Sequence, residues 1–187
     1  MSGAPAGRKP LWTWLWERPA RRWLLGIPIG AFLALGAGAV GWISFEAVLA
    51  ATNTEEFCTS CHEMKDNVYA EYVGTIHDKN RTGVRATCPD CHVPKAFHHK
   101  MARKIQATFK ELPNHFLGKI DTPEKFAQHR EAMAESVWAG MRKTDSRECR
   151  NCHKLDHMDL ERQDKIAKKR HAAALEKHDK TCIDCHQ

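Results

Sequence analysis

The sequence predicts a mainly α-helical protein, with one N-terminal transmembrane helix followed by a small domain that has little or no sheet. Three observations support this fold class. Residues 24–45 form an uncharged apolar run, no later segment alternates apolar and polar residues as a half-buried strand would, and one short cysteine motif occurs four times in two similar pairs. We expect three regions: an N-terminal segment at 1–22, a membrane helix at 23–51 and a second domain at 52–187.

The run from Leu24 to Phe45 is 22 residues long and rich in Leu, Ile, Ala and Gly. A helix of this length spans about 33 Å, which is enough to cross the hydrocarbon core of a bilayer. Pro28 falls in its first turn, where proline disturbs a helix least. A cleaved signal peptide is the alternative, because residues 48–50 resemble a cleavage site, but apolar regions of signal peptides usually have about 7–15 residues. We therefore favour a retained anchor in the lipid bilayer.

The two flanks of this run set its orientation. Five cations and one acid, Glu17, precede the run; the cations are Arg8, Lys9, Arg18, Arg21 and Arg22. By the positive-inside rule the N-terminus stays in the cytoplasm and the chain after residue 51 is exported. Tryptophans at both ends are expected to anchor the helix at the two interfaces: Trp12, Trp14, Trp16, Trp23 and Trp42.

Every cysteine in the chain belongs to a Cys-x-x-Cys-His motif. The cysteines are Cys58, Cys61, Cys88, Cys91, Cys149, Cys152, Cys182 and Cys185. This spacing is typical of covalent haem c, which is held by two thioether bonds and by the histidine as an iron ligand. A thioredoxin-like redox pair, a zinc site or a disulfide framework would not require a histidine after each second cysteine. We therefore expect four covalently bound haem c groups.

The second domain is small for a domain that binds four haems. It has 136 residues, or 34 for each of four haems, so a protein core alone would be modest and the haems must form much of it. The net charge is +6, of which +4 comes from the N-terminal flank. The remaining cations are suitable partners for haem propionates. Because they are scattered between the motifs and not grouped on one face, we expect no nucleic-acid partner.

The motifs fall into two similar pairs. They begin at residues 58, 88, 149 and 182, and the second motif of each pair reads Thr-Cys-x-Asp-Cys-His. A further histidine stands 11 residues before the first cysteine of that second motif in each pair: His77 and His171. We read two duplicated di-haem modules, at about 52–94 and 145–187.

Two helices are expected between the modules, and one within the second. The first carries an apolar stripe from Phe97 to Leu112 and ends at Pro113, and the second starts at a capping segment, residues 121–124, with proline at its first helical position. A third helix, at about 163–177, should carry His171. We expect the stripes on the first two to cover haem faces.

Each haem iron needs a proximal ligand, and a low-spin electron carrier also needs a distal one. The proximal candidates are the motif histidines: His62, His92, His153 and His186. Equivalent positions in the duplication single out His77 and His171 as distal ligands. His115, and then His98 or His99, are weaker candidates; His157 and His178 rank lower, and His129 is expected at the surface.

A methionine beside the first motif has no counterpart in the second module. Met64 follows His62 by two residues, whereas Leu155 occupies the equivalent offset after His153. The methionine could pack on the porphyrin, or it could bind the first iron and raise the potential of that haem. The spacing alone favours packing.

These features together resemble the NapC/NirT family of membrane quinol dehydrogenases. The resemblance rests on the anchor, the paired motifs, Cys-His-x-Met at 61–64, and three stretches around the later motifs: 83–94, 145–153 and 180–186. It implies a tetrahaem cytochrome of the bacterial inner membrane, with its haem domain in the periplasm. Such a protein takes electrons from menaquinol or ubiquinol and delivers them to a periplasmic reductase of nitrate, nitrite or a similar oxidant.

The resemblance also implies roles for particular residues. In the related nitrite-reductase partner branch the equivalent of Met64 binds the first iron and leaves that haem high-spin beside the quinol. Asp90 corresponds to an acid near the quinol, and a basic residue of the same loop should join it: Lys79, Arg81 or Arg85. Family members close to the nitrate-reductase type continue after the fourth motif with Gly-Ile-Ala-His, whereas this sequence ends at Gln187. Either a C-terminal tail with this histidine is missing, or one haem takes its distal ligand from elsewhere in the chain or from a partner protein.

Two other functions compete with quinol oxidation. The chain could be a tethered electron carrier that another protein loads, with no quinol site of its own, or a catalytic cytochrome that reduces a small oxidant at an open haem. The sequence leaves open which quinol and which reductase are used, and whether the protein forms a homo-oligomer.

Overall fold

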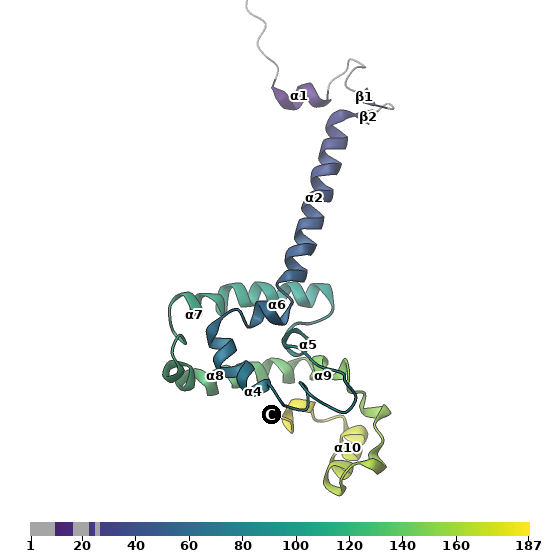
Figure 1. Cartoon of the computed structure of the whole chain (residues 1–187). Helices are drawn as coiled ribbons and strands as arrows, with labels where there is room; N and C mark the ends of the chain where they lie inside the picture. The colour runs from purple at the N-terminus through teal and green to yellow at the C-terminus, as the bar shows by residue number, and fades with distance from the viewer. Residues whose placement is uncertain (1–9, 17–22, 25–26) are drawn as a thin grey trace, which may run out of the picture. The chain divides into compact units, whose positions relative to one another are not determined.

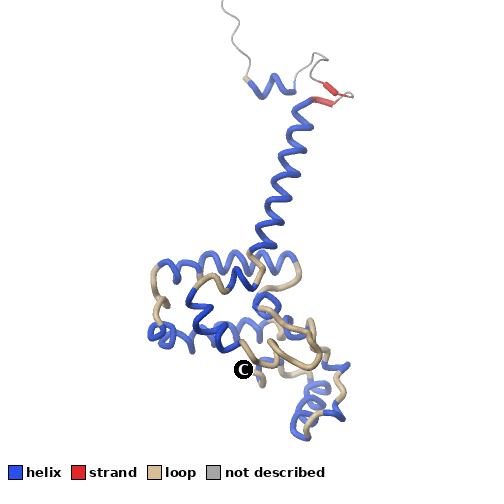
Figure 2. Tube along the Cα trace, viewed as in Figure 1, coloured by secondary structure: helices blue, strands red, loops and turns tan. Residues whose placement is uncertain are grey.

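The computed structural model describes residues 10–16, 23–24 and 27–187, and the chain divides into two compact units, residues 1–51 and 52–187. The flanking charges that predict the orientation, Glu17 and the five cations before the apolar run, lie outside the described residues. The described part is mainly helical, and its only strands are two residues long each (Figure 2). The expected fold class is confirmed.

The first unit contains one long helix. A short helix, α1 (Leu11–Trp16), is followed by a two-stranded antiparallel ribbon of β1 (Trp23–Leu24) and β2 (Ile27–Pro28), and then by α2 (Ile29–Ala51). Its 23 residues make α2 long and apolar enough to span a membrane, and among the described helices no other meets this test. Trp42 on α2 is exposed, as a lipid-facing anchor should be.

The expected start of this helix, at residue 23, is wrong by six residues. Leu24 and Ile27 pair across the ribbon, and the helix begins directly after Pro28 instead of including it in its first turn. Proline lacks a backbone N–H and pushes the residue before it into extended conformation. Ile27 is therefore placed in a strand, and helical geometry begins only after the proline.

The second unit is built from helices and loops (Figure 1). Its long helices are α6 (Phe97–Lys110), α8 (Pro123–Lys143) and α10 (Lys165–Lys177), with the short α7 (Leu112–Phe116) following α6. The remaining elements are α3 (Glu55–Cys58), the π-helical turn η2 (Met64–Tyr69), α4 (Ala70–Tyr72), α5 (Cys88–His92), α9 (Arg147–Arg150) and three 3₁₀ turns, η3 (Leu155–His157), η4 (Leu160–Arg162) and η5 (Cys182–Asp184).

Local sequence signals set the starts of the long helices α8 and α10. Thr122 caps α8 by accepting from the Lys125 amide, and Pro123 occupies the first helical position, as expected. Asp164 caps α10 by accepting from the amides of Ile166 and Ala167, at 2.9 Å each. Pro113 differs from the prediction: α6 ends at Lys110, before the proline, and Pro113 lies in the first turn of α7.

We expect the Asp164 cap to make stability depend on pH. The two amides hold the pKa of Asp164 below its ordinary value of about 3.9. A depressed carboxyl pKa stabilises the fold above the unfolded pKa, and this contribution is lost as the pH falls through the folded pKa. Asparagine also caps but does not titrate. Thermal unfolding of Asp164→Asn should thus show a lower Tm than wild type at pH 7, and the gap should narrow as the pH is lowered below about 3.9. A gap that does not narrow over this range would contradict the prediction.

Few apolar side chains of the second unit are buried by protein. Among the described residues the buried apolar side chains are Phe126, on α8, and Ile183, in η5. Several residues of the predicted stripes are exposed: Phe97, Ile105, Phe109, Leu112 and Val137. Phe116 of α7 is exposed as well. Flat apolar faces of this kind are what porphyrins require as neighbours, which agrees with the expectation that haems form much of the core.

Candidate functional site

The four cysteine motifs lie on successive short helices that contact one another. Helix α3 packs against α5, and α5 packs against α9. The Cys58 thiol hydrogen-bonds the Cys88 thiol, the Cys91 thiol lies near those of Cys149 and Cys152, and that of Cys149 lies near that of Cys182. The motifs are therefore arranged in space in the order of the sequence, from the first to the fourth.

All eight cysteines are free, so none is used in a disulfide. Burial raises the pKa of the thiols of Cys58, Cys88, Cys91 and Cys149, which keeps these sulfur atoms uncharged. An uncharged sulfur in partly apolar surroundings suits a thioether better than it suits a thiolate ligand of zinc.

Histidine rings face each other in three pairs. The ring centroids lie 6.2 Å apart for His77 and His153, 6.1 Å for His171 and His186, and 6.5 Å for His62 and His115. Two imidazoles on opposite sides of one iron, each nitrogen about 2 Å from the metal, place their centroids about 6.3 Å apart. Each pair joins one motif histidine to one histidine outside the motifs, and the spacing of the rings is the one that a six-coordinate haem iron needs. In the His62–His115 pair, Nε2 of His62 and Nδ1 of His115 both lie near Oε1 of Glu63, at 3.6 Å and 2.7 Å, so one of these rings would have to turn before both could bind one iron.

The pairs also show which motif each distal candidate faces. His171 faces the motif of its own module, whereas His77 faces His153 in the other module. The duplication that selects both histidines therefore does not extend to their partners. In residues 27–187 no second histidine ring contacts His92, so the motif without a histidine partner is the second.

The remaining histidines are placed away from such pairs. His98 and His99 lie side by side at the start of α6, with ring centroids 4.0 Å apart. His129 is exposed and bonds the Lys125 carbonyl at 2.8 Å, as expected for a surface residue. His157 is exposed, and His178 ends α10 in a left-handed conformation with φ of 50°.

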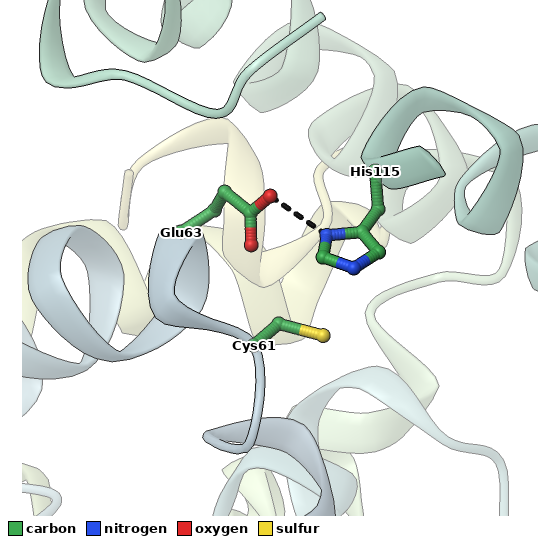
Figure 3. A group of neighbouring side chains, drawn as sticks. All are labelled: Cys61, Glu63 and His115. Atoms are coloured by element: carbon green, nitrogen blue, oxygen red, sulfur yellow. Dashed lines mark hydrogen bonds and ion pairs between the residues drawn. The ribbon is translucent and has the colours of Figure 1, made fainter. Parts of the chain in front are cut away.

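A buried acid and a histidine from α7 lie beside the first motif. His115, on α7, bonds the buried carboxylate of Glu63, with 2.7 Å between its Nδ1 and Oε1 of Glu63 (Figure 3). Met64 is half-buried at the start of η2. Sequence reasoning missed Glu63, although its place directly after His62 was a signal that could have been used.

Asp90 has a structural role that the sequence did not reveal. Its Oδ2 accepts from the amide of Thr87 at 2.8 Å and from the Thr87 hydroxyl at 2.7 Å, which forms a capping box at the start of α5. Asp184 forms the same box with Thr181 at the fourth motif. The Thr87 groups hold the pKa of Asp90 below its usual range, so this side chain is a carboxylate at neutral pH.

The three basic candidates of the preceding loop differ in their surroundings. Arg85 forms ion pairs with Asp78, at 2.7 Å, and with Glu55, at 2.9 Å. These pairs tie the loop to the first helix of the second unit. Lys79 and Arg81 are exposed and form no ion pair with the described residues.

A buried serine and an ion pair connect the segments that carry the third and fourth motifs. Ser146 is fully buried and adopts a left-handed conformation, with φ of 48°, and its hydroxyl accepts from the Ile183 amide at 3.1 Å. Arg142 adds an ion pair to Asp184, with Nε 3.1 Å from Oδ1.

A cavity of about 350 Å³ opens beside His153. Its lining includes three cations and two carboxylates, and Arg150 is paired with Asp145 at 2.8 Å; the charged residues are Asp145, Arg150, Lys154, Asp156 and Lys180. Lys154 and Lys180 form no ion pair with the described residues and are suited to bind carboxylates such as haem propionates. The free cysteine pairs, the facing imidazoles, the exposed apolar stripes and this cavity thus all fit haem c.

A comparison with protein families matches residues 22–187 to the model described as NapC/NirT cytochrome c family, N-terminal region. The chain belongs to the NapC/NirT cytochrome c family. It is 48% identical to the cytochrome c-type protein NapC of Escherichia coli K12 over 181 residues, covering 96% of this chain and 86% of the relative. It is 54% identical to the denitrification system component NirT of Stutzerimonas stutzeri over 175 residues, covering 92% and 84%.

A third relative is also similar over most of this chain. The cytochrome c-type protein NapC of Paracoccus pantotrophus is 45% identical over 182 residues, covering 93% of this chain and 76% of the relative. None of the solved structures matches the chain. As a member of the NapC/NirT family, the protein is a membrane-anchored c-type cytochrome with four covalently bound haems, and α2 is its candidate anchor.

Proposed function

We propose that this protein oxidises a membrane quinol, menaquinol or ubiquinol, and passes the electrons to a periplasmic reductase of nitrate or nitrite type. The family and the names of the relatives support this function, and the sequential contact of the four motifs is the structural observation that carries it. Haem c supplies one-electron oxidation and reduction at iron. The protein then determines distance, ligation and the exit of protons.

We infer a bacterial inner-membrane protein with its N-terminus in the cytoplasm and residues 52–187 in the periplasm. The cations before residue 23 and the apolar length of α2 support this orientation. The second unit begins one residue after α2 ends, so α3 and the first motif are close to the membrane along the chain. The first motif is therefore the expected entry for electrons.

We propose a quinol site beside the first two motifs. Arg85 bonds Glu55 of α3 and so holds the loop of Lys79 and Arg81 near the start of the second unit. Because Arg85 is committed to two carboxylates, Lys79 and Arg81 are the better candidates to contact a quinol. Asp90 uses Oδ2 in its capping box, which leaves Oδ1 to accept a hydrogen bond from a quinol hydroxyl.

The facing rings support a set of axial ligands. We propose His62 with His115 for the first haem, His153 with His77 for the third, and His186 with His171 for the fourth. His92 is proposed as the proximal ligand of the second haem. The proposed pairing at the first haem gives Met64 a packing role, in contrast to the ligand role that the family resemblance implies.

Two matched substitutions test the quinol site. Asp90→Asn and Asp184→Asn alter the same capping box at the second and fourth motifs. Asp184→Asn also removes the ion pair with Arg142, so it should disturb folding at least as much as Asp90→Asn. We expect Asp90→Asn to slow the reduction of the haems by a menaquinol analogue at least tenfold, and Asp184→Asn to slow it less than twofold. The rate is measured by absorbance in detergent, with dithionite reduction as the control for intact haems.

One observation favours the competing function, a tethered electron carrier without a quinol site. The capping bonds of Asp90 explain the presence of this acid even if no quinol binds. If menaquinol and ubiquinol analogues both leave the wild-type haems oxidised while dithionite reduces them, the carrier is the better description. Equal slowing by the two asparagine substitutions would remove Asp90 from the quinol site but would leave quinol oxidation standing.

A further inference from the structure

Helix α6 has an exposed apolar face. Ile105 and Phe109 on this helix are 54% and 75% exposed. Three further exposed apolar side chains follow in α7 or directly after it: Leu112, Phe116 and Leu117. The two helices contact each other and lie at one edge of the second unit (Figure 1). Large apolar side chains gathered on one short segment indicate a surface that another molecule covers.

Haems attached to the first two motifs would not cover this face of α6. Arg103 lies near the histidine of the second motif, and Lys104 lies near the first cysteine of the first motif. Successive residues of an α-helix are rotated by about 100°, so Ile105 projects about 160° away from Arg103, and Phe109 about 140° away from Lys104. The two apolar side chains therefore point away from the side of α6 that faces these motifs.

A hydrogen-bonded lysine ties α6 to the residue that follows the apolar helix. Thr52 comes directly after α2 and is the first residue of the second unit. The Lys104 ammonium donates to the Thr52 carbonyl, and its Nζ lies 2.9 Å from the Thr52 hydroxyl oxygen. Since α2 is the candidate membrane anchor, these bonds keep α6 close to the residue where the chain passes from the bilayer into the second unit.

Positive charge is concentrated on the same segment. Residues 95–119 contain six cations and one acid, whereas the rest of the second unit contains 18 cations and 20 acids. Three of the six cations are exposed and form no ion pair with the described residues: Lys95, Lys110 and Lys119. An apolar helix face accompanied by lysines is typical of helices that lie in the interface of an anionic membrane.

We propose that α6 lies on the surface of the lipid bilayer, with Ile105 and Phe109 among the acyl chains and the neighbouring lysines at anionic lipid headgroups. The bonds to Thr52 and the positive charge favour lipid as the occupant of this face over a second copy of the chain or a periplasmic protein. One membrane helix does not fix the orientation of the domain attached to it, whereas a second contact would hold the first motif at a constant distance from the membrane. The proposal involves neither quinol nor reductase, so its failure would leave the proposed function standing.

The test is photolabelling of the full-length, haem-loaded protein in vesicles of phosphatidylcholine and phosphatidylglycerol, with a lipid that carries a diazirine in its acyl chain. Mass spectrometry then identifies the labelled peptides. We expect label on α2 and on the peptide that contains Ile105 and Phe109. Ile166 is the matched control, because it is as exposed as Phe109, at 75%, but belongs to α10 in the second di-haem module. Its peptide should carry about tenfold less label than that of α6.

Two variants and a second kind of vesicle make the result decisive. Combining Ile105→Ser with Phe109→Ser should lower the label on α6 about tenfold with all four haems still bound, because serine gains little from burial in lipid. Ile166→Ser should leave the label on α6 unchanged. Vesicles of phosphatidylcholine alone should also lower it, because they offer the lysines no anionic headgroup.

Label on α2 alone in the wild-type protein, with α6 labelled as little as α10, would overturn the proposal. This is the result expected if a second copy or a periplasmic protein covers the face. Equal label on α6 in the two kinds of vesicle would overturn the proposed headgroup contacts. If the double serine variant does not mature, the comparison of α6 with α10 in the wild-type protein decides between these outcomes.

Discussion

Replacing His115 by alanine is expected to convert one haem in four from low-spin to high-spin. The ring of His115 faces that of His62 at 6.5 Å, so its removal takes away the proposed sixth ligand of the first iron. The covalent attachment should survive, because both cysteines and His62 remain. Magnetic circular dichroism counts the low-spin haems, and a haem assay confirms that four are still bound.

Met64→Leu is the matched control for this substitution. Leucine has nearly the same volume as methionine but cannot bind iron, so a packing role predicts an unchanged spin count. The opposite pair of results, with His115→Ala silent and Met64→Leu losing a ligand, would establish the methionine ligation that the family resemblance implies. The two substitutions therefore separate the two assignments directly.

His77→Ala is expected to open an axial position at the third haem, not at the second. His77 lies in the first module, but its ring faces His153 at 6.2 Å. Because this ligand joins the two modules, its loss should lower the Tm of the second unit as well as convert one haem to high-spin. His171→Ala, whose ligand pair stays within one module, should convert one haem with a smaller change in Tm.

The position of the open haem is the critical measurement for His77. A density map of the haem-loaded variant should show the vacant axial position on the iron attached through Cys149 and Cys152. A vacant position on the iron attached through Cys88 and Cys91 would show that each module ligates its own haems, and the proposed pairing across modules would be wrong.

The sequence predicted much of the fold because the relevant signals are local. The motif spacing, the apolar run, and the cap at Thr122 and Pro123 each act within a few residues. The predicted start of the membrane helix was wrong because Pro28 favours an extended conformation for the residue before it, although the apolar pattern continues through that residue. For the site, position in the duplication selected His77 and His171 but could not say which motif each one faces.

Roles that depend on distant contacts were not predictable in this way. Arg85 was one of three equal candidates until its ion pairs with Glu55 and Asp78 showed that it is occupied. Asp90 suggested a quinol ligand until its bonds to Thr87 showed a cap as well. Glu63 carried no motif of its own, and only the fold brings it into contact with His115, 52 residues away.

The sequence by itself determined that this chain binds four haems, carries one apolar helix and belongs among helical cytochromes, because covalent spacing and helical periodicity are properties of short segments. Only the tertiary structure decided that the four motifs follow one another in space and that His77, His115 and His171 face His153, His62 and His186. Such pairings arise from the packing of segments far apart in the chain, and no local pattern records which segment will lie opposite which.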